Sequence, residues 1–323
     1  MLLGLLDYAQ MARNFFPPAP ALLPKDYPSL ADKVVIVTGG NSGVGFEVVK
    51  LLGATGAKVY IFARSEASTL QAIEDAKKVD KDIDVHFVKV DLSDLTTIKP
   101  AAEEFLARES RLDLVIHNAG VMIPPKGSTS AQGYELQLGT NIIGPFALQK
   151  LLTPVMYETV EKFNTANESR IVWVSSSAHA LSPKHGINLD NLNDLTADEW
   201  SNYGHSKAGM MIAAAQWAKH NPKEAAKIVT ISVDPGNLKT NLQRHMSSFT
   251  EKILLYTLFP AINGAYSELF AALSPAVSTA NNGEYIIPWG RFGRIRADVA
   301  ESAGNETGEK FYKYLEDETA KYL

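Results

Sequence analysis

Short runs of β-branched residues alternate with longer amphipathic stretches from Lys33 onward, and this alternation constrains the fold more than any other feature of the chain. Six strands are expected, at 34–37, 58–62, 85–90, 112–117, 170–174 and 228–233. Strands separated by helices pair in parallel through right-handed crossovers. With a last short strand at 284–287, the sequence predicts a single α/β domain with helices on both faces of a doubly wound, mainly parallel sheet of seven strands. The longest helix is expected over 131–163.

Two further segments are expected around this domain, which spans residues 31–290 and includes a roof over the ligand pocket at 238–282. Residues 1–30 form an arm that is rich in proline at its end. Residues 291–323 form a charged, weakly helical tail on the surface. The arm carries an apolar stripe that either packs on the domain or makes peripheral contact with a membrane, formed by Leu2, Leu5, Leu6, Met11, Phe15 and Phe16.

Composition narrows the class of protein. The 323 residues carry a net charge of -5 and no Lys/Arg cluster of the kind that binds nucleic acid. Without cysteine there is no disulfide and no thiol chemistry, which suits a reducing compartment and predicts a cytoplasmic protein. The N-terminus lacks the basic segment of a secretory signal, and no apolar run reaches the roughly 18 residues of a membrane span. No metal is expected, because the histidines are not set with carboxylates at ligand spacing.

A glycine-rich segment, 38–45, lies between the first strand and the first helix. Glycines there let the backbone approach a pyrophosphate, and the following helix N-terminus favours an anion. This placement predicts a Rossmann-type dinucleotide site. Its expected contacts are Gly39, Asn41, Ser42, Gly43, Val44 and Gly45.

Tyr203 and Lys207 lie four residues apart and therefore on one helix face. An ammonium one turn from a phenol favours the phenolate and lowers the phenol pKa from about 10 toward the working pH. Such a proton donor suits carbonyl reduction or alcohol oxidation. A serine cluster, 175–177, ends the fifth strand at the sheet edge where ligands bind, although three serines can also simply end a strand.

Together, Thr-Gly-x-x-x-Gly-x-Gly at 38–45, the serine cluster and Tyr-x-x-x-Lys resemble the classical short-chain dehydrogenases/reductases over about residues 31–240. The resemblance implies that Ser176 holds the substrate oxygen and that Tyr203 is the general acid/base. It also implies that Lys207 binds the nicotinamide ribose and that Asn141 organises a water leading to Lys207.

The same resemblance implies further cofactor contacts. They are Asp91 and Leu92 at the adenine, Asn118, Ala119 and Gly120 beside the nucleotide, and Pro235, Gly236 and Thr240 over the nicotinamide, in addition to Tyr203 and Lys207. Two alternatives remain open, since Asp91 can cap a helix and Pro-Gly can make an ordinary turn. His117 is expected to be a strand-end imidazole satisfied by backbone rather than a catalytic base.

Arg64 stands near the end of the second strand, where an NAD-selective site has an acidic residue. A guanidinium offers a 2′-phosphate charge-assisted hydrogen bonds, so NADP(H) is the expected cofactor. The alternative is a surface Arg64 that pairs with Glu66.

Segments 133–141 and 174–179 resemble the retinol-dehydrogenase-like branch of the family. This resemblance implies a small apolar substrate, and the expected function is NADP(H)-dependent interconversion of an apolar ketone or aldehyde and its alcohol. The alternatives are an NAD-dependent alcohol dehydrogenase and a catalytically silent nucleotide-binding sensor. Family members commonly pair through the helices that carry Asn141 and Tyr203, so a homodimer is expected unless the C-terminal region covers that surface.

Overall fold

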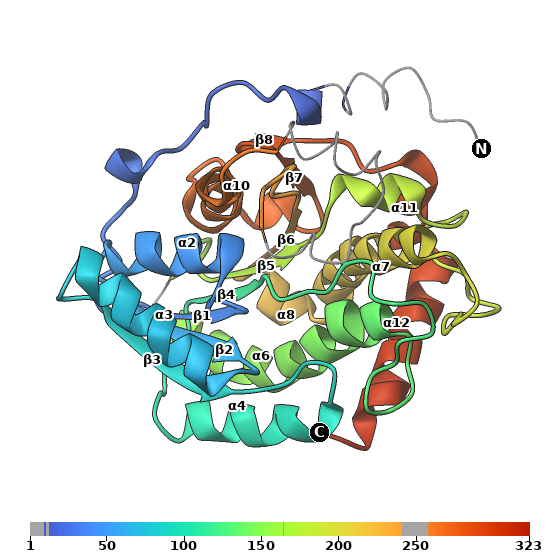
Figure 1. Cartoon of the computed structure of the whole chain (residues 1–323), viewed down its shortest axis with the longest axis horizontal. Helices are drawn as coiled ribbons and strands as arrows, with labels where there is room; N and C mark the ends of the chain where they lie inside the picture. The colour runs from blue at the N-terminus through green and yellow to red at the C-terminus, as the bar shows by residue number, and fades with distance from the viewer. Residues whose placement is uncertain (1–9, 11–12, 164, 241–257) are drawn as a thin grey trace.

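The computed structural model describes residues 10, 13–163, 165–240 and 258–323, and these residues form one sheet with helices on both faces (Figure 1). The strand order is β3-β2-β1-β4-β5-β6-β7-β8, with all neighbours parallel except the antiparallel β7–β8 pair. The strands are β1 (Val34–Thr38), β2 (Lys58–Ala63), β3 (Asp84–Lys89), β4 (Leu114–His117), β5 (Arg170–Val174), β6 (Val229–Val233), β7 (Tyr285–Ile287) and β8 (Arg291–Phe292). The doubly wound α/β prediction is confirmed.

The predicted count of seven strands is wrong, because β8 adds an eighth. It pairs with β7 through Ile286 with Phe292 and Ile287 with Arg291. A strand of two residues is too short to leave an alternating pattern in the sequence, which is why the prediction placed Arg291 in a surface tail.

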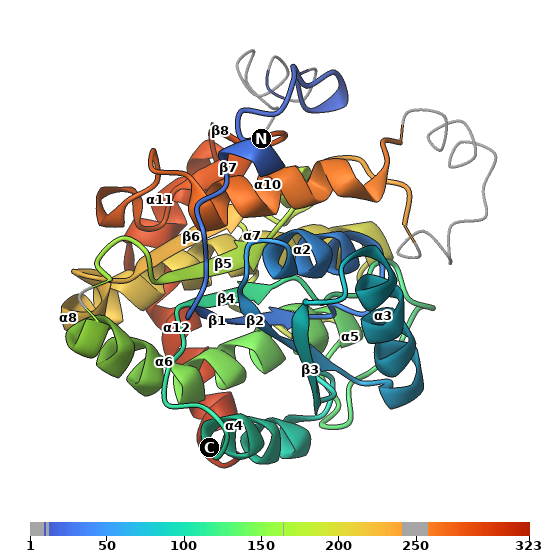
Figure 2. The same ribbon diagram turned by 90° about the vertical axis from the view of Figure 1, so that its left-hand side faces the viewer.

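The main helices are α2 (Gly43–Gly53), α3 (Glu66–Val79), α4 (Ile98–Leu106), α6 (Gly144–Phe163), α7 (Glu199–His220), α10 (Ala261–Leu273), α11 (Ala297–Gly304) and α12 (Glu306–Ala320). Shorter turns are η1 (Pro24–Asp26), η2 (Leu95–Thr97), α5 (Leu136–Leu138), η3 (Gly139–Ile143), η4 (Ser177–Leu181), α8 (Pro222–Ala225) and η7 (Thr279–Asn281). Figure 2 shows α2 and α10 on one side of the sheet and α4 and α6 on the other. Strand residues alternate between the two cores: Val35 and Val37 pack under α2 and α10, whereas Val34 and Ile36 pack against the layer of α4, α6 and α7.

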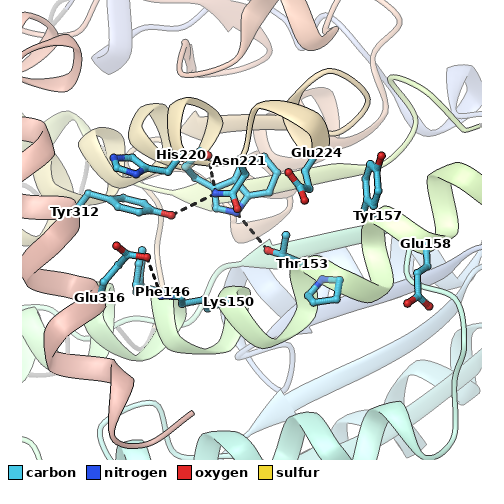
Figure 3. A pocket seen from close by; sticks show the side chains of 12 residues that line it. Phe146, Lys150, Thr153, Tyr157, Glu158, His220, Asn221, Glu224, Tyr312 and Glu316 are labelled. Atoms are coloured by element: carbon cyan, nitrogen blue, oxygen red, sulfur yellow. Dashed lines mark hydrogen bonds and ion pairs between the residues drawn. The ribbon is translucent and has the colours of Figure 1, made fainter.

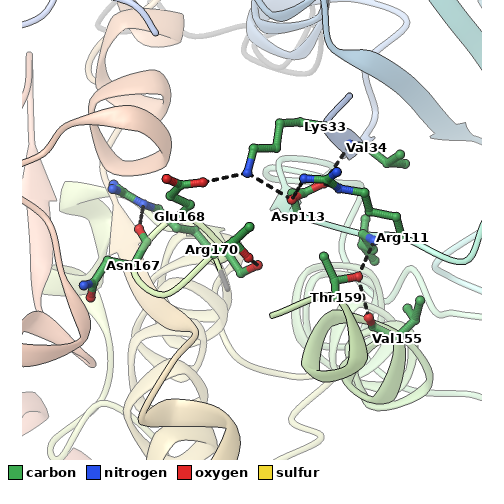
Figure 4. A network of polar contacts seen from close by, with 12 residues as sticks. Lys33, Val34, Arg111, Asp113, Val155, Thr159, Asn167, Glu168 and Arg170 are labelled. Carbon is green, nitrogen blue, oxygen red and sulfur yellow. Dashed lines mark hydrogen bonds and ion pairs between the residues drawn. The ribbon is translucent and has the colours of Figure 1, made fainter. Parts of the chain in front are cut away.

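A buried carboxylate joins the N-terminal ends of β1 and β4 (Figure 4). Asp113 accepts the backbone N–H of Val34 at 2.9 Å and the Arg111 Nε–H at 2.7 Å, and the Lys33 ammonium lies 3.5 Å away. These charges and the backbone donor compensate for burial of the carboxylate. The two strands therefore keep the register that brings their opposite ends together at the functional edge.

The C-terminal region differs from the prediction of a surface tail. The charged residues of α12 do face solvent, but its opposite face places Phe311, Tyr312 and Leu315 in the core with α6 and α7. The spacing of three and four residues between these apolar side chains is that of an amphipathic helix. The charge content of the segment obscured this stripe.

The predicted helix over 131–163 is shorter at its start. Gly133 has φ +83°, the left-handed region, and the Ser130 N–H donates to the Tyr134 carbonyl, so 130–134 forms a turn. The helix begins with α5, continues through the π-helical η3 and ends with α6.

The apolar stripe of the arm lies mostly outside the described residues, since Leu2, Leu5, Leu6 and Met11 are not among them. Of the remaining two members, Phe15 is half-buried and Phe16 is 80% exposed. Among the described residues no helix is long and apolar enough to cross a membrane. In the predicted roof, 241–257 also lie outside the described residues, and α10 packs on β5 and β6.

Candidate active site

The glycine-rich segment forms a tight cradle at the C-terminal end of β1. Gly39 has φ +67°, and a Cβ placed on Gly45 would lie 2.4 Å from the Asn118 Nδ2 and 2.7 Å from the Gly39 carbonyl oxygen. Asn118 donates to the Thr38 carbonyl at 2.9 Å, and the Ala119 N–H donates to the Thr38 Oγ1 at 2.9 Å. Only glycine fits at position 45, and the cradle presents the N-terminus of α2 at the sheet edge.

Thr240 closes this cradle from the opposite side. A Cβ placed on Gly43 would lie 3.6 Å from the Thr240 Cβ, so the segment after β6 lies against the start of α2. In the same segment Gly236 has φ +96°, which favours glycine, and a Cβ there would lie 3.2 Å from the Pro288 Cγ. The structure thus brings the predicted Pro235–Gly236 turn and the predicted glycine contacts to one edge.

Arg64 follows β2, and its side chain is 75% exposed. It lies 3.9 Å from the Asp91 Oδ2, so the ion pair among the described residues is with Asp91 and not with Glu66. Asn41 reaches the same region, where its Nδ2 donates to the Ser68 Oγ at 2.7 Å. An exposed guanidinium beside the capped N-terminus of α3 forms a site suited to an anion.

Asp91 forms a local turn rather than a helix cap. Its Oδ1 accepts the Ser93 N–H at 3.0 Å and the Ser93 hydroxyl at 2.6 Å. The cap of η2 is Asp94, whose side chain accepts the Thr96 N–H at 3.1 Å. Leu92 is buried, and a Cβ placed on Gly144 would lie 2.2 Å from its carbonyl oxygen, which brings this segment against the start of α6.

Ser176, Tyr203 and Lys207 come together where β5 ends and α7 passes. The Lys207 Nζ donates to the Val174 carbonyl at 2.8 Å and lies 5.6 Å from the centre of the Tyr203 ring. Ser176 lies near enough to the Tyr203 hydroxyl to lower its pKa, and the Ser176 Oγ accepts the Ala178 N–H at 3.1 Å. A half-buried serine hydroxyl, a buried phenol and a buried ammonium group therefore share one corner of the sheet edge.

Burial governs the ionisation of this corner. It raises the pKa of Tyr203, while the nearby Ser176 side chain lowers that pKa and the charge of Asp234 raises it. Burial lowers the pKa of Lys207 to about 8. Ser176 is the contact that lowers the Tyr203 pKa here, and the effect of Lys207 on that pKa stays a prediction.

Asn141 lies in the π-helical turn η3, and its carboxamide is fully engaged. Its Oδ1 accepts the Val121 N–H at 2.8 Å, and its Nδ2 donates to the Val121 carbonyl at 3.0 Å and to the Ser206 Oγ at 2.9 Å. A Cβ placed on Gly120 would lie 3.1 Å from the Asn141 Oδ1 and 3.7 Å from the Lys207 Nζ. Asn141 thus fixes the backbone next to Lys207.

His117 is buried below the site. Its Nε2 is 3.0 Å from the Gln149 Oε1, and its ring stacks on Trp173 with centroids 4.5 Å apart. Burial lowers the His117 pKa to about 4, so the imidazole is neutral at pH 7. The expected backbone partner is wrong: Nε2 meets the Gln149 side chain, and the buried Nδ1 has no hydrogen-bond partner among the described residues.

Sequence reasoning missed Asp234 and Asn14. Asp234 is buried, its Oδ1 accepts the Gly236 N–H at 2.9 Å, and its Oδ2 accepts the Asn14 Nδ2–H at 3.3 Å. Burial raises the pKa of Asp234 to about 6. An acidic residue directly before the Pro-Gly turn was a signal for Asp234, whereas nothing in the sequence links Asn14 to it.

A groove of about 460 Å³ lies away from this edge, between α6, α8, α12 and the end of α7 (Figure 3). There the His220 ring stacks on Tyr312 at 4.2 Å, and Asn221 donates to the Tyr312 hydroxyl at 3.3 Å. Lys150 bridges to Glu316 at 2.8 Å. None of the predicted site residues lines the groove. No group of acidic or histidine side chains suited to a metal ion occurs among the described residues.

Comparisons with known proteins agree with this geometry. A family model for short chain dehydrogenase matches residues 33–188. A short-chain dehydrogenase/reductase of Phomopsis amygdali is 39% identical over 321 residues, covering 95% of this chain and 96% of the relative. Another, from Armillaria gallica, is 38% identical over 316 residues, covering 97% and 98%.

Solved structures show the same fold. A crystal structure from Mycobacterium paratuberculosis superposes with a TM-score of 0.69 at 25% identity, covering 93% of this chain and 97% of that one. The 3-ketoacyl-(acyl-carrier-protein) reductase of Brucella melitensis, complexed with NADH, gives a TM-score of 0.61 at 21% identity and covers 80% and 96%. The family model and the relatives, matched over nearly their whole length, show that the chain is an oxidoreductase that belongs to the short-chain dehydrogenase/reductase family.

Proposed function

We propose that the protein reduces an apolar ketone or aldehyde to its alcohol with NADP(H), and that Tyr203 is the general acid. The observation that carries this proposal is the buried corner of Ser176, Tyr203 and Lys207 beside the glycine cradle. A phenol beside a serine hydroxyl is placed to protonate a substrate oxygen that contacts both groups.

The residues present fit NADP(H). The cradle leaves no room for a Cβ at Gly45 and exposes the N-terminus of α2, as a pyrophosphate requires. Arg64 and Asn41 stand beside the N-terminus of α3, where a 2′-phosphate would be held by charge-assisted hydrogen bonds. Asp91 and Leu92, Asn118, Ala119 and Gly120, and Pro235, Gly236 and Thr240 would complete the nucleotide site.

The nicotinamide supplies the hydride when the cofactor is bound. Ser176 donates a hydrogen bond to the carbonyl oxygen and stabilises the negative charge that develops there. Tyr203 transfers its proton to that oxygen, and in the oxidative direction its phenolate accepts the proton. Lys207 would hold the nicotinamide ribose and places a positive charge near the phenol, and Asn141 keeps the backbone at Gly120 beside Lys207.

The substrate class follows from the resemblance of 133–141 and 174–179 to the retinol-dehydrogenase-like branch, and that branch assignment stays a prediction. A cytoplasmic location and peripheral membrane contact through the N-terminus also stay predictions.

NADPH consumption with a panel of apolar ketones and aldehydes tests the proposal. We expect turnover by the native protein and a loss of at least about 100-fold in kcat for Tyr203→Phe, because the proton donor is removed. Tyr157→Phe, in the remote groove, is the matched control and should keep native activity. A native protein that binds NADPH but consumes none with any member of the panel would be a sensor and not an enzyme.

A further inference from the structure

The segment that follows Ser176 is held by Arg296, which lies between β8 and α11. The Arg296 Nη1 donates to the carbonyls of Ala180 and Ser182, both at 2.9 Å. Its Nη2 donates to the Pro183 carbonyl at 2.6 Å and to the Asp298 Oδ2 at 3.1 Å, and its Nε donates to the Asp298 Oδ1 at 2.6 Å. All five N–H donors of the guanidinium therefore have an acceptor.

His179 joins this arrangement directly to Ser176. Its Nε2 is 3.3 Å from the Arg296 backbone N, and its Nδ1 is 2.8 Å from the Ser176 carbonyl oxygen. A backbone N–H only donates and a carbonyl only accepts, so Nε2 must be the acceptor and Nδ1 must carry the proton. Both contacts require the same neutral tautomer, which makes His179 a bridge between the two backbones.

The far end of the bridge is itself fixed. Gln10 pairs with the Arg294 backbone through two reciprocal hydrogen bonds, Nε2 to the carbonyl and the Arg294 N–H to Oε1, each 2.7 Å long. Asp298 also accepts the His185 N–H at 2.9 Å. The segment from Ser176 to His185 is thus anchored at several points to one short stretch of chain, 296–298, and Gln10 holds the residues just before that stretch.

We propose that His179 and Arg296 are positioning residues that set where the Ser176 hydroxyl meets the substrate oxygen. The inference rests on the proposed function, in which Ser176 is catalytic. Neither residue touches the reacting atoms. Loss of either would let the backbone at Ser176 shift, and a displacement of about 1 Å at a hydrogen-bonding group costs roughly 100-fold in rate.

Four variants test the inference by separating chemistry from cofactor binding. In His179→Ala and Arg296→Met we expect kcat to fall about 10- to 100-fold while the Kd for NADPH stays within about threefold of native, because the nucleotide cradle is untouched. His179→Asn restores an N–H near the Nδ1 position and should recover most of the kcat lost in His179→Ala. Arg296→Lys has only three donors without the planar fork and should not recover it. Arg108→Met, an exposed arginine on the loop after α4, is the control.

Hydrogen exchange of the backbone supplies a readout that needs no turnover. His179→Ala and Arg296→Met should speed exchange within 177–185 and leave the glycine cradle unchanged. A kcat within about threefold of native in His179→Ala, or His179→Asn no better than His179→Ala, would overturn the inference. Unchanged exchange at 177–185 in both variants would also overturn it. A native protein without turnover, but with faster exchange in the variants, removes the proposed function and leaves the anchoring of this segment supported.

Discussion

At the scale of single residues, Glu268 on α10 is a buried carboxylate without compensation by hydrogen bonds. It is fully buried, and neither carboxylate oxygen has a hydrogen-bond partner. Burial raises its pKa from 4.5 to about 8, and the charge of Lys207 lowers that pKa in opposition. An acid with a raised pKa in the folded state keeps its proton where the unfolded chain has already released it, so rising pH favours unfolding.

Glu268→Gln should therefore stabilise the protein in a pH-dependent manner. Between pH 4.5 and 8 the native protein loses up to about 1.4 kcal/mol of unfolding free energy per pH unit from this group, and the variant does not. We expect near-equal stabilities at pH 5 and an advantage of about 1–3 kcal/mol for the variant at pH 8. Urea unfolding at pH 5 and pH 8 measures the difference in unfolding free energy between the variant and the native protein. A difference that does not change with pH would contradict the raised pKa of Glu268.

Arg64→Ala tests the cofactor preference. Loss of a charge-assisted contact to the 2′-phosphate should weaken NADPH binding at least about tenfold and leave NADH within about threefold. Fluorescence titration with each nucleotide measures both constants, and Arg108→Ala is the control. An unchanged ratio between the two cofactors would rule out Arg64 as the phosphate contact and favour the NAD-dependent alternative.

Candidate site residues could be predicted from the sequence where they belong to one short motif. The glycine segment and the pair Tyr203 and Lys207 each lie within eight residues of sequence, and the structure brings them to one edge. Asn14 meets Asp234 across 220 residues, and the ties of Arg296 to Ala180 span 116, so no local pattern could reveal them.

At the scale of secondary structure, Arg170 at the start of β5 holds the end of α10. Its Nη1 donates to the Ala271 carbonyl and its Nη2 to the Ser274 carbonyl, both at 2.9 Å. The last carbonyls of a helix have no partner within the helix, and here they are buried. The guanidinium thus fixes α10 over the sheet.

Arg170→Met should destabilise the fold. It leaves two buried carbonyls without donors, and each loss costs about 1–3 kcal/mol, so we expect a decrease of roughly 2–5 kcal/mol in unfolding free energy. Urea denaturation measures the decrease, with Arg108→Met as the control. A decrease below about 0.5 kcal/mol would show that water replaces the guanidinium.

The strands β1, β2, β4, β5 and β6 were predictable because each is an almost entirely buried, apolar run of four to six residues, whereas β3, at the edge of the sheet, is only partly buried. Elements that depend on tertiary packing were not predictable. β8 is strand only because β7 lies beside it, and α12 carries too many charges for its buried stripe to stand out. The turn at Gly133 overrode the helical pattern of the residues around it.

At the scale of the whole molecule, α12 lies on the surface through which family members are expected to pair. It packs against α7 and α6, and Glu318 contacts the Tyr134 hydroxyl at its far end. Pairing through the same surface would compete with Phe311 and Leu315, which are buried there. The homodimer expected from sequence therefore stays a prediction, and this packing stands against it.

Removal of residues 306–323 should expose that apolar surface. We expect the shortened protein to self-associate and to lose several kcal/mol of stability, because burial of each large apolar side chain contributes about 1.5–3 kcal/mol. Light scattering coupled to size-exclusion chromatography, compared with the intact chain, measures the association. A shortened protein with the same oligomeric state and the same unfolding midpoint as the intact chain would show that α12 does not protect this surface.

Transfer of deuterium from NADPH labelled at nicotinamide C4 to the carbonyl carbon of an apolar ketone tests the central claim most directly. NADPH can carry deuterium on either face of C4, and the enzyme transfers the hydrogen from one face. With the label on that face, mass spectrometry should show deuterium in the alcohol formed by the native protein. Tyr203→Phe should bind the labelled cofactor and form almost no product. Unlabelled alcohol with both C4-deuterated forms of NADPH would contradict the account, and so would native rates of transfer in Tyr203→Phe.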